Sequence, residues 1–304
     1  MDLSTLFNHK KVIFSLEIFP PKKDTPYNVI YNTLLKLRGL PVDFISVTYG
    51  AGGSVAQREK TVEIASLILT TYHIEPVVHL TCVNSDRREI SETLSKLKEG
   101  NIQNILALRG DITPGIPPKE EFKHASDLAK FIKETDPSFN LIGGCYPECH
   151  PECENPDRDI ENLKIKIDSG VSHLITQLFF DNRVFYEFRE KAVQAGIHVP
   201  IEAGIMPIVN KNQVERTVTM CGASVPPKMA RFISKYCDDP VALKDAGLFY
   251  ATEQIMDLID NGVQGIHLYT MNNVDIATRV SDAIQNIVAA ENNPLRWCTD
   301  RRHS

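Results

Sequence analysis

The acidic residue Glu17 stands at the end of an apolar run, between Leu16 and the pair Ile18-Phe19. Apolar surroundings disfavour the charged form of a carboxyl group, which raises its pKa and suits it to general acid catalysis near neutral pH. A carboxylate paired with a neighbouring cation is the alternative interpretation. His79 ends another apolar run, where a hydrogen-bonded core histidine is the ordinary finding and a catalytic histidine the alternative.

The tripeptide Arg109-Gly110-Asp111 follows a further apolar run. A guanidinium group can bind phosphate in bidentate fashion, and glycine permits close approach of a ligand to the backbone. Asp111 can accept hydrogen bonds from a heterocycle, although a structural ion pair between Arg109 and Asp111 is the alternative. Thr48 and Tyr49 offer hydroxyl groups and an aromatic face that suit a planar ligand.

Three polar residues, Asp159, Asn162 and Lys166, follow i, i+3, i+7 spacing within a stretch of helical period. That spacing places them on one face of the helix, beside its apolar stripe. The spacing alone favours a solvated helix face, and a ligand-binding face is the alternative.

The chain has seven cysteines, and this odd number in a chain of 304 residues argues against a disulfide scaffold. Cys145, Cys149, Cys153 and His150 form a cluster. Zinc sites more often show two paired Cys-x-x-Cys units or distant Cys/His pairs. We therefore expect reduced thiols and no metal.

The charge balance excludes several classes of partner. Lys and Arg number 33 against 39 Asp and Glu, a net charge of −6, so a general nucleic-acid or acidic-membrane binder is not expected. No apolar run approaches the roughly 18 residues that span a bilayer. We expect a cytoplasmic protein.

Eight short apolar runs place the polar residues at their downstream ends. Helical stretches separate the runs, a pattern typical of parallel βαβ units with strands buried on both faces. A doubly wound sheet is disfavoured because no Gly-x-Gly-x-x-Gly follows the first run. The runs begin near Val12, Phe44, Pro76, Ile105, Leu141, His173, Ile201 and Gly265.

The sequence therefore predicts an α/β fold, a single-domain (β/α)8 TIM barrel over residues 1–291. A polar C-terminal tail is expected at 292–304. Extra helices are expected between strands seven and eight, where a helix is indicated from Thr252 to Asn261. Active sites of such barrels lie at the carboxyl ends of the strands, so the polar residues meet at one mouth.

Read together, the strand ends resemble those of the methylenetetrahydrofolate reductase family, flavin-dependent barrel enzymes of one-carbon metabolism. The resemblance covers about residues 12 to 290 and is closest to the short bacterial form, which consists of the catalytic barrel alone. The matching segments are FSLEIFPPK (14–22), FISVTYGAGG (44–53), HLTC (79–82), ILALRGD (105–111), ASDL (125–128), YPECHPE (146–152), DIENLKIKIDSG (159–170), ITQLFFD (175–181), GIMPI (204–208) and HLYTMN (267–272).

The resemblance implies roles for individual residues. Glu17 matches the general acid, and Asp111 matches a carboxylate beside the flavin that also contacts the folate pterin. Gln177, Gln213 and Asn273 match substrate contacts, although the family usually has arginine where this chain has Asn273. The positions that match contacts to FAD or to the nicotinamide are Thr48, Tyr49, Ala51, His79, Arg109, Gly110, Asp111, Ala125, Tyr146, His150, Asp159, Asn162 and Lys166.

The implied reaction reduces 5,10-methylenetetrahydrofolate to 5-methyltetrahydrofolate and serves methionine biosynthesis. NAD(P)H would reduce noncovalent FAD, and FAD N5 would then pass hydride to the folate while Glu17 helps to protonate N10. A partner redox protein is an alternative electron donor, and a barrel folate methyltransferase without flavin is an alternative enzyme. We also expect a homo-oligomer.

Overall fold

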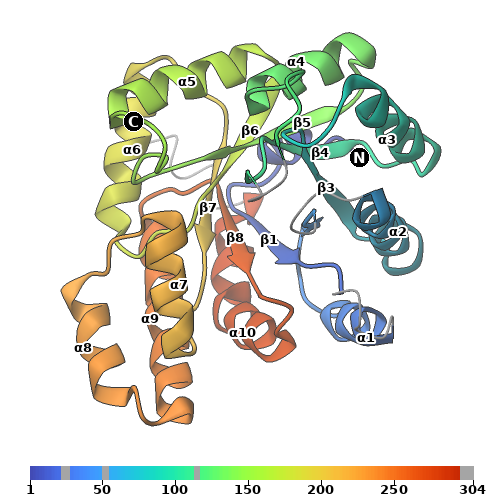
Figure 1. Cartoon of the computed structure of the whole chain (residues 1–304). Helices are drawn as coiled ribbons and strands as arrows, with labels where there is room; N and C mark the ends of the chain where they lie inside the picture. Colours follow the sequence, from blue (N-terminus) through green and yellow to red (C-terminus); the bar gives the residue numbers. More distant parts are fainter. Residues whose placement is uncertain (22–27, 50–54, 113–116, 295–304) are drawn as a thin grey trace.

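Eight parallel strands close into a barrel in the order of the sequence (Figure 1). The computed structural model describes residues 1–21, 28–49, 55–112 and 117–294. Every strand begins within two residues of its expected position, so the predicted (β/α)8 barrel is confirmed. The strands are β1 (Ile13–Ile18), β2 (Phe44–Val47), β3 (Glu75–Thr81), β4 (Asn104–Leu108), β5 (Asn140–Cys145), β6 (Val171–Thr176), β7 (Ile201–Ile205) and β8 (Gly265–Tyr269).

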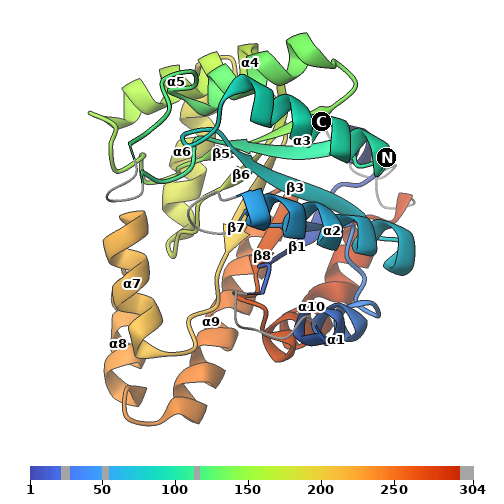
Figure 2. The same cartoon turned by 45° about the vertical axis from the view of Figure 1, so that its right-hand side comes forward.

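Helices follow the strands and surround the barrel (Figure 2). Local signals start several of them. Asp86 and Glu89 form a reciprocal capping box at the start of one helix, and Asn155 caps another whose first residue is Pro156. The helices of the ring include α1 (Asn28–Leu37), α2 (Val55–Tyr72), α3 (Arg87–Glu99), α4 (Ala125–Thr135), α5 (Pro156–Asp168), α6 (Asn182–Gln194) and α10 (Val274–Glu291). No helix among the described residues is both long and apolar enough to cross a membrane.

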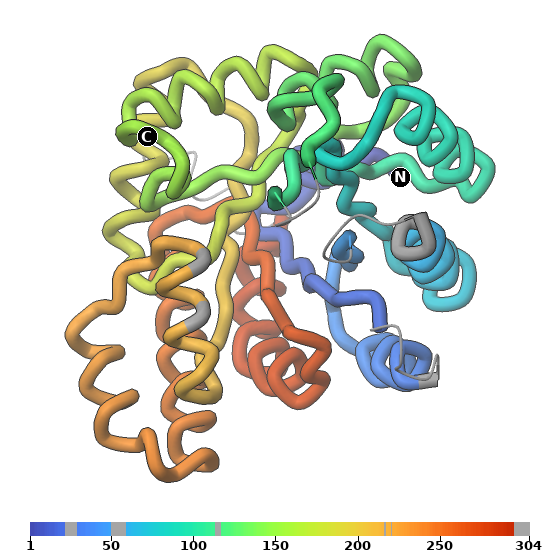
Figure 3. The backbone as a smooth tube through the Cα atoms, in the orientation of Figure 1, coloured from blue at the N-terminus to red at the C-terminus, as the bar shows by residue number. Residues whose placement is uncertain are grey.

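The predicted extra helices lie between β7 and β8. They are α7 (Lys211–Cys221), α8 (Pro227–Tyr236) and α9 (Pro240–Asp260), and Figure 3 follows the backbone through them. Helix α9 packs against β7, α6 and α10, so it occupies the ring position between α6 and α10. Helix α8 packs against α9. A separate apolar cluster that includes Met206 and Met229 joins this insertion to the ends of β6 and β7.

Helix α9 is longer than the expected helix from Thr252 to Asn261. It begins at Pro240, where Asp239 accepts hydrogen bonds from the backbone N–H groups of the first turn. Glycine at position 247 disfavours a helix in sequence terms. In the fold it is required, because a Cβ at Gly247 would lie 1.6 Å from the carbonyl oxygen of Ile208. The loop after β7 therefore contacts the backbone of α9 directly.

The amino-terminal end of the barrel is filled by the 3-10 helix η1 (Leu3–Asn8). Leu3 is fully buried in an apolar cluster with Ile13, Phe44 and Val77 from the first strands. Its backbone N–H donates to Asn104 Oδ1 over 3.1 Å. This end of the barrel is thus filled mainly by apolar side chains around the buried Asn104, and the polar residues that the sequence singled out at the strand ends lie at the opposite end.

The end of α10 is tied to the start of β1. Asn292 Oδ1 accepts hydrogen bonds from the backbone N–H groups of Lys11 and Val12, and its Nδ2 donates to Val12 O. The expected tail begins at this residue, and its part from 295 to 304 lies outside the described residues.

The close approach at Gly247 predicts a large effect of one added methyl group. We expect Gly247→Ala to lower the free energy of unfolding by about 3 kcal/mol or more, because α9 and the loop must separate. Gly39→Ala is the matched control, since nothing lies within 4 Å of its Cβ position. Urea denaturation of both variants measures the effect, and equal midpoints would contradict the packing described here.

Candidate active site

Glu17 lies near the carboxyl end of β1, opposite Ser46 of β2 and Tyr269 of β8. Glu17 is buried, with 6% of its surface exposed. Its Oε2 lies 3.4 Å from His79 Nε2 and 3.8 Å from His267 Nε2. In the described part of the chain, the ionisable partners of this carboxyl group are therefore imidazoles. No lysine or arginine there forms the ion pair that was the alternative interpretation.

His79 is held in its neutral form. Burial lowers its pKa to about 4, and the nearby His267 acts in the same direction, while Glu17 opposes the change. The contact between His79 and Glu17 is therefore not an ion pair near neutral pH. His79 is also more than the core histidine that its sequence position indicated, because it contacts the candidate acid directly.

Two polar atoms that follow β2 and β3 lack a hydrogen-bond partner among the described residues. They are Thr48 Oγ1, just after β2, and Asn84 Oδ1, in the loop after β3, and both are buried. Buried polar groups are normally hydrogen-bonded, so this end of the barrel has the unsatisfied atoms that a bound polar ligand would pair. Sequence reasoning missed Asn84, although its place shortly after a strand is the available signal.

Arg109 pairs with a residue that the sequence did not indicate. Its guanidinium group binds both carboxylate oxygens of Glu152, with Nη2 to Oε1 at 2.8 Å. This hydrogen bonding raises the pKa of Arg109. The side chain of Asp111 is exposed, and the ion pair of Arg109 is with Glu152. The alternative of a structural Arg109–Asp111 pair is therefore wrong. A phosphate bound by Arg109 would displace Glu152 or share the guanidinium group with it.

Gly110 has a positive φ of 84°, and a Cβ there would lie 2.9 Å from Thr81 Cβ. The requirement for glycine thus already follows from backbone conformation and packing within the chain. Ala125, the first residue of α4, is buried. Ala51 lies outside the described residues.

The loop after β5 and the start of α5 form a second part of the site. The rings of Tyr146 and His150 meet edge to face with centroids 4.6 Å apart. The backbone N–H of His150 donates to Asp159 Oδ2 over 3.0 Å. Burial raises the pKa of Tyr146 to about 12 and lowers that of His150. Both side chains are therefore uncharged at neutral pH.

The polar face of α5 is divided. Lys166 turns towards β5, where its Nζ donates to Gly144 O over 2.6 Å, and burial lowers its pKa. Asp159 is half-buried and contacts the loop after β5. Asn162 is exposed. A fully solvated face, which spacing alone favoured, is therefore wrong for Asp159 and Lys166 and describes Asn162.

The amide side chains expected at the substrate hold backbone groups in this structure. Gln177 Oε1 accepts from the backbone N–H of Leu178 over 2.9 Å. Gln213 Oε1 accepts from the N–H of Val209, and its Nε2 donates to Pro207 O. These contacts fix the loops after β6 and β7.

Asn273 is the N-cap of α10, with its Oδ1 accepting from the backbone N–H of Ile276. The preceding Asn272 has a positive φ of 58° and bonds both backbone groups of Phe19, at 2.8 and 2.9 Å. Asn272 therefore joins the loop after β8 to the loop after β1, which follows Glu17. Sequence reasoning missed this role, because the partner is distant in the chain.

Cys145, Cys149 and Cys153 are free thiols in the structure. Burial raises the pKa of Cys145 well above its usual range and that of Cys149 to about 11. The part of the chain that the structure describes contains no group of three His, Cys, Asp or Glu side chains placed to hold a metal ion.

A closed parallel barrel that carries a buried acid and unsatisfied polar atoms at its carboxyl end is the arrangement of a (β/α)8-barrel enzyme. The family model described as methylenetetrahydrofolate reductase matches residues 2–285 of this chain. The chain therefore belongs to the methylenetetrahydrofolate reductase family of oxidoreductases.

Individual relatives agree. The chain is 34% identical over 263 residues to the 5,10-methylenetetrahydrofolate reductase of Escherichia coli (strain K12), covering 86% of this chain and 87% of that protein. It is 33% identical over 273 residues to methylenetetrahydrofolate reductase (NADH) 1 of Arabidopsis thaliana, covering 85% of this chain and 46% of that protein. An uncharacterized protein from Clostridium thermocellum shares the fold, with a TM-score of 0.62 at 15% identity over 95% of this chain and 100% of its own.

The low pKa of His79 predicts a pH-dependent stability. Because the native state keeps His79 neutral down to about pH 4, while the unfolded chain protonates it near 6.5, this residue's contribution is complete above pH 6.5 and is lost as the pH falls towards 4. The difference corresponds to roughly 3 kcal/mol of unfolding free energy.

We therefore expect His79→Gln to lose less unfolding free energy than wild type between pH 7 and pH 4. His198→Gln, at an exposed histidine, is the matched control and should follow wild type. Denaturant titrations across this range measure the slopes, and parallel curves for all three proteins would show that His79 is not held neutral.

Proposed function

We propose that this protein reduces 5,10-methylenetetrahydrofolate to 5-methyltetrahydrofolate, with FAD as its bound cofactor and NAD(P)H as the electron donor. The observation that carries the proposal is the placement of Glu17. In a chain of this family, a buried carboxyl group lies at the mouth of the barrel beside His79 and His267.

Glu17 acts as the acid in this proposal. It holds a proton and delivers it towards N10 of the substrate, which favours opening of the five-membered ring. Neutral His79 supports this role, because a cation at that position would stabilise the carboxylate instead. A well-placed general acid contributes about 10²–10⁴-fold to a rate.

The residues at the mouth suit a flavin. The ring system of a flavin presents N–H and C=O groups, and Thr48 Oγ1, Asn84 Oδ1 and His79 Nε2 are buried polar atoms without a hydrogen-bond partner among the described residues. Asp159 and Lys166 on α5 are turned inward and suit the remainder of FAD. When bound, the cofactor supplies the hydride.

Substrate recognition rests in our proposal on Asp111 and Gln177. Asp111 is exposed after β4, accepts no hydrogen bond from the described residues, and would accept hydrogen bonds from a pterin edge. Gln177 has its amide nitrogen available for a ligand while its oxygen bonds the backbone of Leu178. Gln213 and Asn273 would contact the folate only by giving up the backbone groups that they now hold.

We expect the purified protein to be yellow and to release FAD rather than FMN. The inward-facing Asp159 and Lys166 are placed to serve the additional nucleotide part of FAD. Lys166→Met should reduce the flavin content, and Lys164→Met, at a lysine that pairs with Asp168, should not. The cofactor released by heat is identified by mass. Recovery of FMN, or no flavin after reconstitution with FAD, would reject this cofactor.

Replacing the acid tests the reaction itself. Glu17→Gln should abolish reduction of methylenetetrahydrofolate and leave flavin reduction by the donor largely intact, because only the folate step needs the proton. Stopped-flow measurement of each half-reaction, with NADH, NADPH and reduced ferredoxin as donors, decides both the role of Glu17 and the donor. Glu99→Gln on the exposed face of α3 is the control. Equal loss in both half-reactions would mean that Glu17 serves the structure or the flavin.

A further inference from the structure

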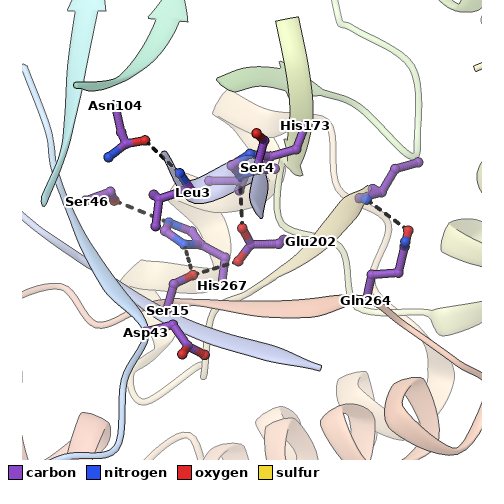
Figure 4. A network of polar contacts seen from close by, with 12 residues as sticks. Leu3, Ser4, Ser15, Asp43, Ser46, Asn104, His173, Glu202, Gln264 and His267 are labelled. Carbon is purple, nitrogen blue, oxygen red and sulfur yellow. Dashed lines mark hydrogen bonds and ion pairs between the residues drawn. The ribbon is translucent and has the colours of Figure 1, made fainter. Parts of the chain in front are cut away.

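A network of polar side chains lies in the centre of the barrel and includes Ser15, Glu202 and His267 (Figure 4). Ser15 lies two residues before Glu17 on β1, so the two side chains point to the same side of the strand. Ser15, His267 of β8, Glu202 of β7 and His173 of β6 are all fully buried. The reaction proposed above gives Glu202 and His173 no part.

The contacts around Ser15 are short. Ser15 Oγ donates to Glu202 Oε2 over 2.8 Å, and Ser15 Oγ also lies 2.7 Å from His267 Nδ1. On the other side of its ring, His267 Nε2 lies 3.4 Å from Ser46 Oγ and 3.8 Å from Glu17 Oε2. Glu202 and Glu17 are thus connected through one hydroxyl group and one imidazole.

The direction of the hydrogen bonds follows from counting protons. An ionised carboxylate only accepts, and a serine hydroxyl has a single proton to donate. Because Ser15 donates its single proton to Glu202 Oε2, its oxygen can only accept from His267, so a proton of the imidazole lies on Nδ1. His267 Nε2 then carries a lone pair, which accepts from Ser46 Oγ over 3.4 Å and faces Glu17 Oε2 at 3.8 Å. A lone pair there accepts from a protonated carboxyl group and repels an ionised one.

The barrel makes room for Glu202 at a cost. Gly265 of β8 lies opposite Glu202 in the sheet, and a Cβ at Gly265 would lie 2.5 Å from Glu202 Cγ. The second oxygen, Oε1, lies 3.2 Å from His173 Nε2. Burial of a carboxyl group in a barrel core is expensive, and an apolar side chain of similar volume is often as stable. Stability alone therefore does not account for this residue.

We propose that Glu202 is a positioning residue for the acid. Through Ser15 it holds the proton of His267 on Nδ1, so that the lone pair of Nε2, and not an N–H group, faces the carboxyl group of Glu17. The inference rests on the proposed role of Glu17 and deepens it. The position of the proton on His267 is nevertheless a property of the protein without cofactor or substrate.

The other ionisable groups that face Glu17, His79 and Tyr269, are uncharged, so His267 is the residue whose proton position matters. His79 of β3 is neutral because burial lowers its pKa. Tyr269 of β8 is neutral because burial, with a smaller contribution from Glu17, raises its pKa. At the far end of the chain of contacts, His173 faces Glu202 and not Glu17. The position of the proton on His267 therefore decides whether an N–H group or a lone pair faces Glu17.

The first test locates that proton. In full-length protein labelled with ¹⁵N in the histidine rings, the resonances of His267 are those lost in His267→Gln. We expect the wild-type spectrum to show the Nδ1–H tautomer and Ser15→Ala to shift it to Nε2–H. Ser281→Ala, which removes a fully buried hydroxyl group on α10, is the matched control and should leave His267 unchanged. An Nε2–H tautomer in wild type would overturn the inference.

The second test measures the folate half-reaction against pH. Ser15→Ala should lose about tenfold or more of the rate at pH 8 and a smaller factor at pH 6, because a higher proton concentration favours the acid form that the folate step needs. Glu202→Leu should behave in the same way, and flavin reduction by the donor should not change in either variant. A uniform loss at every pH would mark a merely structural role and overturn the proposal.

The two results separate this inference from the function on which it rests. An unchanged His267 spectrum in Ser15→Ala, with normal folate reduction by wild type, would overturn the role of Glu202 alone. A wild-type protein that does not reduce methylenetetrahydrofolate would overturn the proposed function together with this deepening of it. Ser15→Ala removes a single buried oxygen, so it decides the matter independently of the larger change in Glu202→Leu.

Discussion

Closure of the barrel between β1 and β8 is the interaction on which the rest of the structure depends. Five residue pairs, from Ile13 with Gly265 to Glu17 with Tyr269, join the first strand to the last. Without this pairing both strands would expose unpaired backbone groups along an edge. The closure also brings Glu17 beside His267, although the two residues lie near opposite ends of the chain. The acid and its environment are thus made by the same contacts that complete the fold.

The two ends of the barrel divide the work between stability and chemistry. At the amino-terminal end, Leu3 of η1 and the first layer of strand side chains form an apolar plug. At the carboxyl end, buried groups such as Thr48 Oγ1 keep unsatisfied hydrogen-bonding capacity. Between the two ends, Ser15 and Glu202 fill the centre with polar groups that pair with one another. Hydrogen bonds in a buried network tie its members to a defined arrangement, although Glu202 Oε1 and the ring nitrogens of His173 have no hydrogen-bond partner among the described residues.

The loops at the mouth are held by side chains whose partners lie far along the chain. Asn272 joins the loop after β8 to Phe19 beyond β1, and Glu148 after β5 accepts from the backbone N–H of Ser224 between α7 and α8. Arg109 and Glu152 join the loops after β4 and β5. These contacts order the mouth before a ligand arrives. A ligand that binds Arg109 would replace Glu152 as the partner of the guanidinium group, so its affinity would also depend on the strength of the Arg109–Glu152 pair.

The sequence by itself determined the strands, most of the helices and the place of Glu17, because local hydrophobic patterns and caps need no distant partner. The sequence did not predict the full length of α9. Glycine disfavours a helix locally, and its presence at position 247 is explained only by the close contact with the backbone of Ile208. The tertiary structure alone decided that Arg109 pairs with Glu152, that Asn272 binds the backbone of Phe19, and that Glu202 reaches Ser15. Side-chain pairing of this kind is decided when the barrel closes, because only closure sets which distant residues share one small volume.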